Sequence, residues 1–207
     1  MRRHLRHDRG ATLIEFALVL PILLLLAYGT AELGLAWTAE NRVQGAVAQA
    51  ARVGASNGAT RESDRDILLS LKVTLEPNVL QRVERVVVFS ATDADGAVPT
   101  VCRNATGDVG NTANRCNSYS GATLRALAAN GSNAATLGFS TTTSNNCATS
   151  RIDRYWCATG RHDSMADPPD WLGVWVKTTY PNPLPTFFGD FQLERTSIYR
   201  IQPDFTG

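Results

Sequence analysis

An apolar run near the N-terminus is the feature that most restricts how this chain can fold. No side chain from Phe16 to Ala31 is charged, and the run extends back to Ala11 with Glu15 as its one acidic interruption. Residues 11–31 form about 31 Å of α-helix, which matches the hydrocarbon thickness of a bilayer. We therefore expect them to be the transmembrane part of a long helix.

The charges on either side of the run predict its orientation. The acidic Glu32 follows it, and four arginines precede it: Arg2, Arg3, Arg6 and Arg9. Positive charge favours the cytoplasmic side of a membrane helix. The sequence thus predicts a single-pass protein of the cytoplasmic membrane with its N-terminus inside. Residues 1–10 would be a cytoplasmic leader peptide, and residues 32–207 an extracytoplasmic domain.

A cleaved secretory signal has the same basic start and apolar centre, so it is the simplest alternative. It would require small residues at a cleavage site after the apolar run. Ala27-Tyr28-Gly29 and Gly29-Thr30-Ala31 meet this requirement loosely, but the helical pattern continues past both. Glu15 also interrupts what would be the apolar centre. A lasting membrane anchor fits the sequence better.

One charge inside the apolar stretch, Glu15, needs an explanation. Insertion scales give an acidic residue a cost of about 2.5 to 3.5 kcal/mol at mid-bilayer and less near the edge, so such a residue indicates function. Thr12-Leu13-Ile14-Glu15 also has the form of a capping box, with Thr12 as N-cap and Glu15 reaching back to the backbone. The residues alone leave both interpretations open, and the two are compatible.

Charge outside the anchor argues against nucleic acid as a partner. Of the chain's 20 basic and 19 acidic side chains, four and two respectively precede residue 32, which leaves 16 basic and 17 acidic. A protein that neutralises phosphates needs a basic surplus. We expect a membrane and other proteins as partners, and no nucleic acid.

Four cysteines, Cys102, Cys116, Cys147 and Cys157, lie in the part predicted to be outside the cytoplasm. An even count in an oxidising compartment indicates disulfides. Zinc is the alternative, but 13, 30 and 9 residues separate successive cysteines, and the only histidine beyond them is His162. We expect no metal and no cofactor. Of three possible pairings we favour Cys102 with Cys116 and Cys147 with Cys157, because short loops close most readily.

Apolar spacing predicts an α+β domain behind the anchor. We expect the long helix to continue to about residue 55, and a second helix over residues 64–75. Segments rich in β-branched and aromatic residues predict strands over 82–90, 172–180 and 191–201. An antiparallel sheet of about three to four strands, resting on the helix, would bury their inward faces.

Residues 92–170 differ in composition from the rest of the chain. They are rich in Asn, Thr, Ser, Gly and Ala, contain all four cysteines, and have one helical segment at residues 122–129. A segment of this polarity cannot build a core unaided. We expect a disulfide-stapled insertion exposed on the outer surface of the domain.

The stretch Arg9-Gly10-Ala11-Thr12-Leu13-Ile14-Glu15-Phe16, behind its basic leader, resembles the class III prepilin signal of type IV pilin-like proteins. The resemblance implies cleavage by a prepilin peptidase between Gly10 and Ala11, which makes Glu15 the fifth mature residue. It also implies that Glu15 pairs with the N-terminal amine of a neighbouring subunit during assembly. Two opposite charges, each costly alone in the membrane, would then offset one another.

Phe16 and the following Ala17-Leu18-Val19-Leu20-Pro21-Ile22-Leu23 narrow the resemblance to TadE-like proteins, which are minor pilins (pseudopilins) of the tight-adherence, or Flp, pilus system. Residues 43–52, 174–181 and 195–200 are also similar to that family. The family implies a structural subunit that can enter a surface pilus. Its partners would be other pilin and pseudopilin subunits, the prepilin peptidase and the inner-membrane assembly platform. A TadE-like and a TadF-like role stay open.

Pro21 removes a backbone hydrogen bond in the middle of the expected helix. Membrane helices tolerate such a proline where neighbours compensate. A simple kink is one interpretation, and a flexible point that helps extraction from the bilayer into a filament is the other. With Glu15 and Phe16, Pro21 completes the residues that we assign to assembly.

No pattern in the chain predicts catalysis. His162-Asp163-Ser164 contains triad residue types, but adjacency in sequence is not how a triad is recognised, and a glycine-flanked serine elbow is absent from the sequence. We expect no enzyme. The hypothesis that competes with a pilin is a permanently membrane-anchored binding or adhesin domain at the cell surface.

Overall fold

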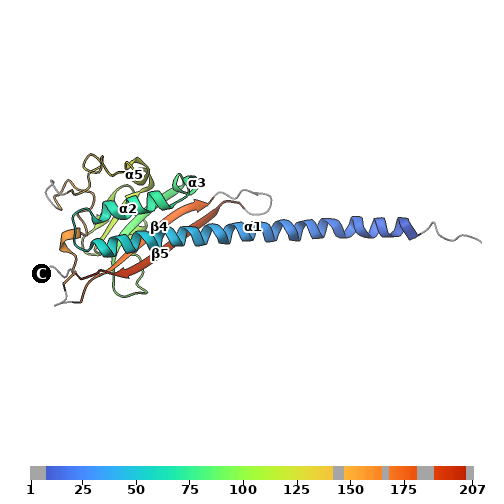
Figure 1. Cartoon of the computed structure of the whole chain (residues 1–207), viewed down its shortest axis with the longest axis horizontal. Helices are drawn as coiled ribbons and strands as arrows, with labels where there is room; N and C mark the ends of the chain where they lie inside the picture. The colour runs from blue at the N-terminus through green and yellow to red at the C-terminus, as the bar shows by residue number, and fades with distance from the viewer. Residues whose placement is uncertain (1–7, 142–146, 165–167, 181–188, 204–207) are drawn as a thin grey trace, which may run out of the picture.

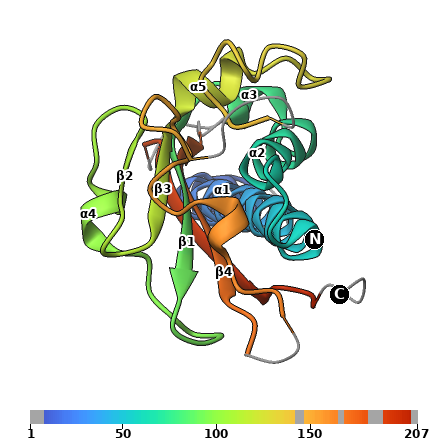
Figure 2. The same cartoon turned by 90° about the vertical axis from the view of Figure 1, so that its left-hand side faces the viewer.

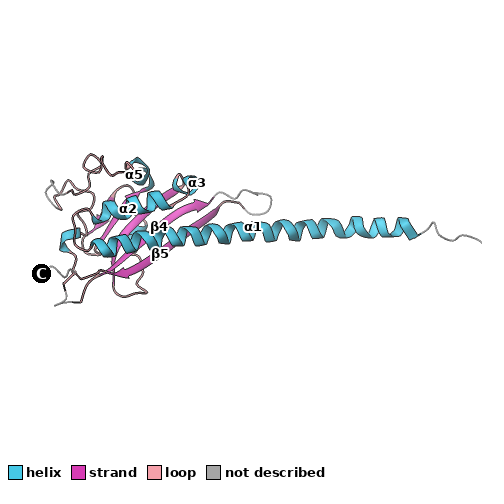
Figure 3. Cartoon of the chain, viewed as in Figure 1, coloured by secondary structure: helices cyan, strands magenta, loops and turns pink. Residues whose placement is uncertain are grey.

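One helix, α1 (Asp8–Asn57), runs the length of the molecule (Figure 1). The computed structural model describes residues 8–141, 147–164, 168–180 and 189–203. The first part of α1 projects as an isolated rod, and its last part packs on a small α+β domain (Figure 3). Its 50 residues span about 75 Å at 1.5 Å per residue. The predicted long helix is confirmed, and it ends two residues beyond the predicted position.

The start of α1 contradicts the capping-box interpretation. The helix begins at Asp8, so Thr12 lies inside it and is not an N-cap. Gly10 is the only helix-disfavouring residue between Asp8 and Thr12, and one glycine costs about 1 kcal/mol in a helix. That cost is too small to stop the helix at Thr12. Glu15 is therefore left without the capping role that the local pattern indicated.

The domain is built on a five-stranded antiparallel sheet with the order β2-β3-β1-β4-β5. The three predicted strands are present as β1 (Val83–Ala91), β4 (Trp171–Tyr180) and β5 (Phe191–Arg200). Each boundary lies within one residue of its predicted position. β4 pairs with β1 on one side and with β5 on the other. The α+β class is thus confirmed.

Two further strands, β2 (Val109–Asn111) and β3 (Cys116–Ser120), come from the cysteine-containing segment and were not predicted. β3 lies inside the sheet, between β2 and β1. Its sequence Cys-Asn-Ser-Tyr-Ser contains no β-branched residue, so strand propensity does not find it. The fold tolerates its buried polar side chains because it supplies partners, as where Arg85 Nη1 donates to Ser118 Oγ at 2.8 Å.

The expectation that residues 92–170 lie exposed on the outer surface is wrong for much of that segment. Its large apolar side chains join the core formed by the sheet and the helices: Tyr119, Leu124, Leu127, Phe139 and Trp156. Both predicted disulfides are present, Cys102–Cys116 and Cys147–Cys157. The segment is polar on average, but a few large residues are enough to complete a core that other elements begin.

The sheet has two covered faces, and different elements cover them. Helix α2 (Ser63–Thr74), predicted for residues 64–75, lies with α1 on one side, whereas the short helix α4 (Thr100–Arg103) lies on the other (Figure 2). Three short helices complete the domain: α3 (Pro77–Leu80), α5 (Gly121–Ala126) and the 3₁₀ helix η1 (Ala158–Gly160). On the α4 side, a second cluster packs Val87, Phe89 and Trp175 against the Cys102–Cys116 disulfide.

Gly173 in β4 makes room for the aromatic ring of Phe89 in that second cluster. It lies directly opposite Phe89 of β1 in the antiparallel register. A Cβ added to Gly173 would lie 2.3 Å from Cζ of Phe89. The Phe89 ring is fully buried and rigid, so it cannot move aside without disturbing its neighbours.

We predict that Gly173→Ala lowers the free energy of unfolding by about 1 to 3 kcal/mol, because it overpacks the cluster around Phe89. Chemical denaturation of the full chain in detergent measures this change. Gly45→Ala is the matched control, since a Cβ there meets no atom within 4 Å. The control should be neutral or stabilising by up to about 1 kcal/mol, as alanine favours the helix. Equal effects of the two substitutions would contradict the prediction.

Candidate functional site

The projecting part of α1 is the first candidate site. Every side chain from Thr12 to Tyr28 is exposed in the isolated chain. Large apolar residues are among them, including Leu13, Ile14 and Leu18. By length and composition, α1 can cross a membrane. A surface this apolar is stable against lipid or against other apolar helices, but not in water.

The residues that we assigned to assembly lie on this projecting part. The Phe16 side chain is 59% exposed. Glu15 is also exposed, and its carboxylate has no hydrogen bond or ion pair with any residue that the structure describes. Helix α1 is continuous through Pro21, which leaves the Ala17 carbonyl without its usual N–H partner. The Gly10–Ala11 bond lies near the start of the same helix.

Toward the domain, one stripe of α1 becomes buried. It begins at Glu32 and continues through Ala39, Val43, Ala46 and Ala50, which recur every three to seven residues. Both Glu32 carboxylate oxygens are buried, and neither has a hydrogen-bond partner among the residues that the structure describes. Glu32 was expected only to mark the outer end of the membrane span. In the structure it is the first residue of the stripe that joins α1 to the domain.

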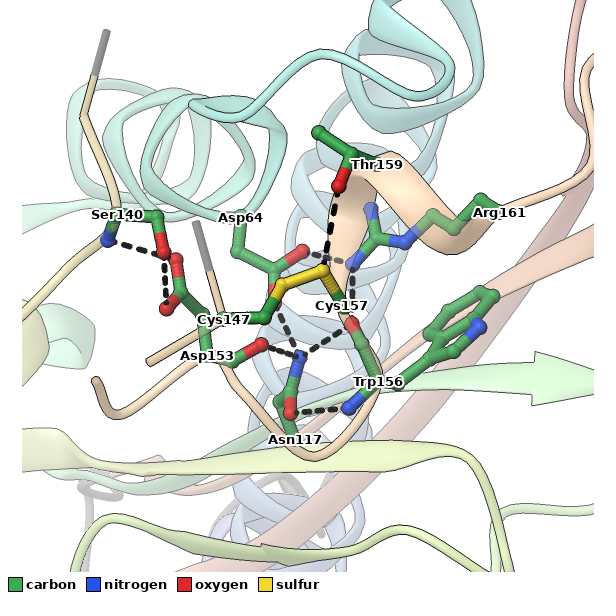
Figure 4. The surroundings of a disulfide bond; sticks show 9 residues. All are labelled: Asp64, Asn117, Ser140, Cys147, Asp153, Trp156, Cys157, Thr159 and Arg161. Carbon is green, nitrogen blue, oxygen red and sulfur yellow. Dashed lines mark hydrogen bonds and ion pairs between the residues drawn. A yellow bond between two sulfur atoms is a disulfide. The ribbon is translucent and has the colours of Figure 1, made fainter. Parts of the chain in front are cut away.

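A buried polar centre joins α2 to the cysteine-containing segment. It is formed by Tyr119 and by Asp64, Asn117, Asp153 and Arg161, and the last four are drawn in Figure 4. Asp64 is the hub. Its carboxylate forms an ion pair with Arg161 and accepts hydrogen bonds from the Tyr119 hydroxyl and from Asn117 Nδ2, the last at 2.8 Å. A buried carboxylate needs such partners, since an unpaired charge in the interior is strongly destabilising.

Asn117 connects this hub to the loop that the Cys147–Cys157 disulfide closes. Its Nδ2 donates to the backbone carbonyls of Asp153 at 3.2 Å and Trp156 at 3.0 Å. Its Oδ1 accepts from the backbone N–H of Trp156 at 2.9 Å. One side chain of strand β3 thereby fixes a loop that has no regular secondary structure of its own.

Two pKa shifts follow from the burial of the polar centre. Burial raises the pKa of Asp153, and the nearby Asp64 charge raises it further, although hydrogen bonds from Ser140 oppose both effects. Burial, with the charges of Asp64 and Asp153, raises the pKa of the Tyr119 hydroxyl well above its usual value. Tyr119 therefore stays protonated and can donate to Asp64. Most of these groups satisfy one another, which suits a structural role, although Arg161 Nε is buried without a hydrogen-bond partner among the described residues.

Residues 10–52 match the model of the TadE-like protein family. The match begins at Gly10, contains Glu15, Phe16 and Pro21, and ends in the part of α1 that packs on the sheet. It confirms, over these residues, the TadE-like resemblance found in the sequence. No curated protein and no solved structure significantly matches the chain.

The TadE-like match covers most of α1 and none of the sheet. The similarity of residues 174–181 and 195–200 to that family therefore stays a prediction, and residue 181 lies outside the described residues. Residues 1–7, which make up most of the predicted leader, lie outside them as well.

The buried polar centre is what the sequence did not predict. Asp64 and Arg161 stand 97 positions apart, and Asp64 and Asn117 stand 53 apart. No local spacing relates residues at such distances. An asparagine within a polar segment gives no sign that it will enter a central strand, because the partners that make its burial tolerable come from other elements.

We predict that Asp153 makes the stability of the domain depend on pH. Its folded pKa is raised above the usual 3.8, so the protonated form fits the fold better. Its stabilising contribution is complete below that value and is lost as pH rises through the raised pKa. Asp153→Asn cannot ionise. The stability of the native chain relative to this variant should thus fall as the pH rises from about 3.8 through the raised pKa of Asp153.

Denaturation of both proteins in detergent across this range measures that difference. Asp93→Asn, in an exposed turn after β1, is the control, and its difference from the native chain should change little with pH. A stability difference for Asp153→Asn that is constant, or that grows with pH, would show that the Asp153 pKa is not raised.

Proposed function

We propose that this chain is a structural minor pilin of the Tad type. In this proposal residues 1–10 stay in the cytoplasm, a prepilin peptidase cuts after Gly10, and the projecting part of α1 packs into a pilus or its priming complex. The observation that carries the proposal is the apolar rod, exposed from Thr12 to Tyr28, in which the Glu15 carboxylate has no partner among the described residues. The TadE-like match over the same residues supports it.

The rod has two environments in this proposal, and both exclude water. Before assembly the apolar side chains lie in the bilayer, and afterwards they contact the helices of other pilin and pseudopilin subunits. Glu15 is costly in either place unless it meets a positive charge. Cleavage would create such a charge at the new N-terminal amine of Ala11.

The helix geometry gives this pairing a definite offset. Ala11 and Glu15 are four residues apart, which corresponds to about 6 Å along the axis. Two parallel helices would bring the amine of one beside the carboxylate of the other when they are shifted by that amount. The ion pair would thus set the axial stagger of neighbouring subunits, in addition to offsetting two charges.

The folded domain has a structural part in this proposal. It stands at the far end of α1 and is held by two disulfides and the buried polar centre. We propose no catalytic step. The assembly platform of the inner membrane would extract the subunit through α1. A permanently anchored adhesin needs none of these events, which makes the two hypotheses separable.

Processing is the first test. We predict that membranes of cells with an active prepilin peptidase contain a form of this chain that lacks ten residues and begins at Ala11. Cells without the peptidase should contain the uncut form. Mass spectrometry of the intact protein distinguishes the two. The same uncut form in both cell types would favour the permanently anchored domain.

Assembly is the second test. We predict that Glu15→Gln, which keeps the size of the side chain but removes its charge, leaves cleavage intact and lowers the assembled fraction at least about tenfold, equivalent to about 1.4 kcal/mol. Glu15→Asp, which keeps the charge, should retain more assembly. Sheared surface fractions, quantified by immunoblot, report the result. Normal assembly of the Gln variant would remove Glu15 from the mechanism.

A further inference from the structure

The end of the sheet farthest from the projecting rod contains an open hollow of about 460 Å³. Its walls come from the end of β1, the turn before β3, the start of β4 and the end of β5. The polar and aromatic residues among them are Ser90, Thr92, Asn114, Arg115, Asp170, Trp171 and Arg200. Pairing of Trp171 with both Ala91 and Arg200 fixes these walls relative to one another.

The position of this hollow is membrane-distal if α1 is the anchor. The backbone N–H of Gln202 donates to the carbonyl of Ala55 at 2.9 Å, so the end of β5 lies beside the last turns of α1. The rod leaves the domain at its opposite end (Figure 1). The hollow would therefore open on the side of the domain that faces away from the membrane.

Arg200 supplies an available positive charge to the hollow. Its guanidinium carbon lies 5.8 Å from the centre of the Trp171 ring, and its side chain is exposed. It has no ion pair with a carboxylate of the described residues. Arg103 and Trp175 form a similar pair at 5.7 Å elsewhere on the sheet, but there the arginine is already bound to Glu194. Arg200 thus remains able to bind an anion.

The acidic residue in the wall of the hollow, Asp170, already has an ion-pair partner and a hydrogen-bond donor. Asp170 forms an ion pair with Arg115 and accepts a hydrogen bond from the backbone N–H of His162 at 3.0 Å. The Arg115 carbonyl accepts from the N–H of Ser90 at 2.9 Å, which ties this wall to β1. Asp170 is therefore neutralised where it stands, so an incoming carboxylate would meet Arg200 without an unpaired negative charge beside it.

Arg200 also lines a second hollow, of about 260 Å³, between β5 and the end of α1. That hollow contains Arg52, which lies over the Tyr199 ring and donates from Nε to the Tyr199 hydroxyl at 3.0 Å. Arg52 likewise lacks an ion pair with the described residues. The two hollows share Arg200 but lie on opposite faces of the sheet, because Tyr199 packs with the α1-side core and Trp171 packs with the second cluster. Only an extended ligand that passes round the end of the edge strand β5 can contact both arginines.

From these contacts we propose that the membrane-distal hollow binds an acidic oligosaccharide, with Arg200 holding a uronate carboxylate and Trp171 packing against a sugar ring. Guanidinium groups recognise carboxylates with two parallel hydrogen bonds. Aromatic side chains supply rigid apolar area, which the C–H face of a sugar can cover. Ser90, Thr92 and Asn114 add hydrogen-bonding groups for hydroxyls.

The charge of the molecule favours this ligand over a denser polyanion. Beyond residue 31 the chain has 16 basic and 17 acidic side chains, which is no surplus for a phosphate backbone. A uronate oligomer has a single carboxylate on each ring and hydroxyls in between. Its carboxylates are farther apart than the phosphates of a nucleic acid, so single arginines separated by polar residues can pair with them.

Titration of the full chain in detergent with tetragalacturonate, followed by calorimetry, tests the proposal. Binding is expected, and it should weaken at least tenfold in Arg200→Ala and less in Arg200→Lys. Arg103→Ala is the matched control because it removes an arginine of the same geometry outside the hollow, and it should bind as the native chain does. Thermal unfolding of each variant checks that the domain is intact.

Two further ligands define the chemistry. The fully methyl-esterified tetramer lacks the carboxylates and should bind at least tenfold more weakly, and free galacturonate should bind more weakly than the tetramer. The proposal is overturned by no binding of tetragalacturonate, by equal binding to Arg200→Ala, or by equal binding of the ester. Tighter binding of a short single-stranded DNA would assign the surface to nucleic acid and overturn it as well.

Discussion

The contact between the buried stripe of α1 and the sheet is the constraint on which the rest of the structure depends. Strands β4 and β5 pack on α1, and α2 packs beside it. The stripe is made largely of alanine and valine, so the helix approaches the sheet closely. The same helix leaves the domain as an exposed apolar rod. Helix α1 therefore needs two different contacts that exclude water: one with the sheet of its own domain, and one with lipid or other apolar helices along the rod.

The sequence was informative wherever a local pattern determines structure. The apolar run predicts the long helix, and β-branched runs predict β1, β4 and β5 to within one residue. Short loop closure favoured the two disulfides that the structure contains. Prediction failed where distant residues decide the outcome. β3 is a strand because β1 and Asp64 supply partners for its polar side chains, and composition cannot reveal those partners.

The projecting rod was predictable for the same reason, since a membrane span and the residues around Glu15 form one continuous pattern. The capping role of Thr12 was not correct, because a four-residue motif could not show that the helix already begins at Asp8. The proximity of Arg200 and Trp171, by contrast, could not be predicted from any local pattern. They are adjacent across two strands but stand 29 positions apart, so only the sheet register brings them together.

The continuity of α1 also couples the domain to any helix packing that the rod enters. With 3.6 residues in each turn, a slip of one residue in that packing would rotate the attached domain by about 100° around the helix axis. Helix α1 is continuous between Thr12 and Asn57, so it would transmit such a rotation to the domain. In the proposed pilus, the axial stagger of neighbouring rods would therefore decide which way each membrane-distal hollow faces. The ion pair between Glu15 and a neighbour's N-terminal amine would in this way orient the outer surface of the pilus.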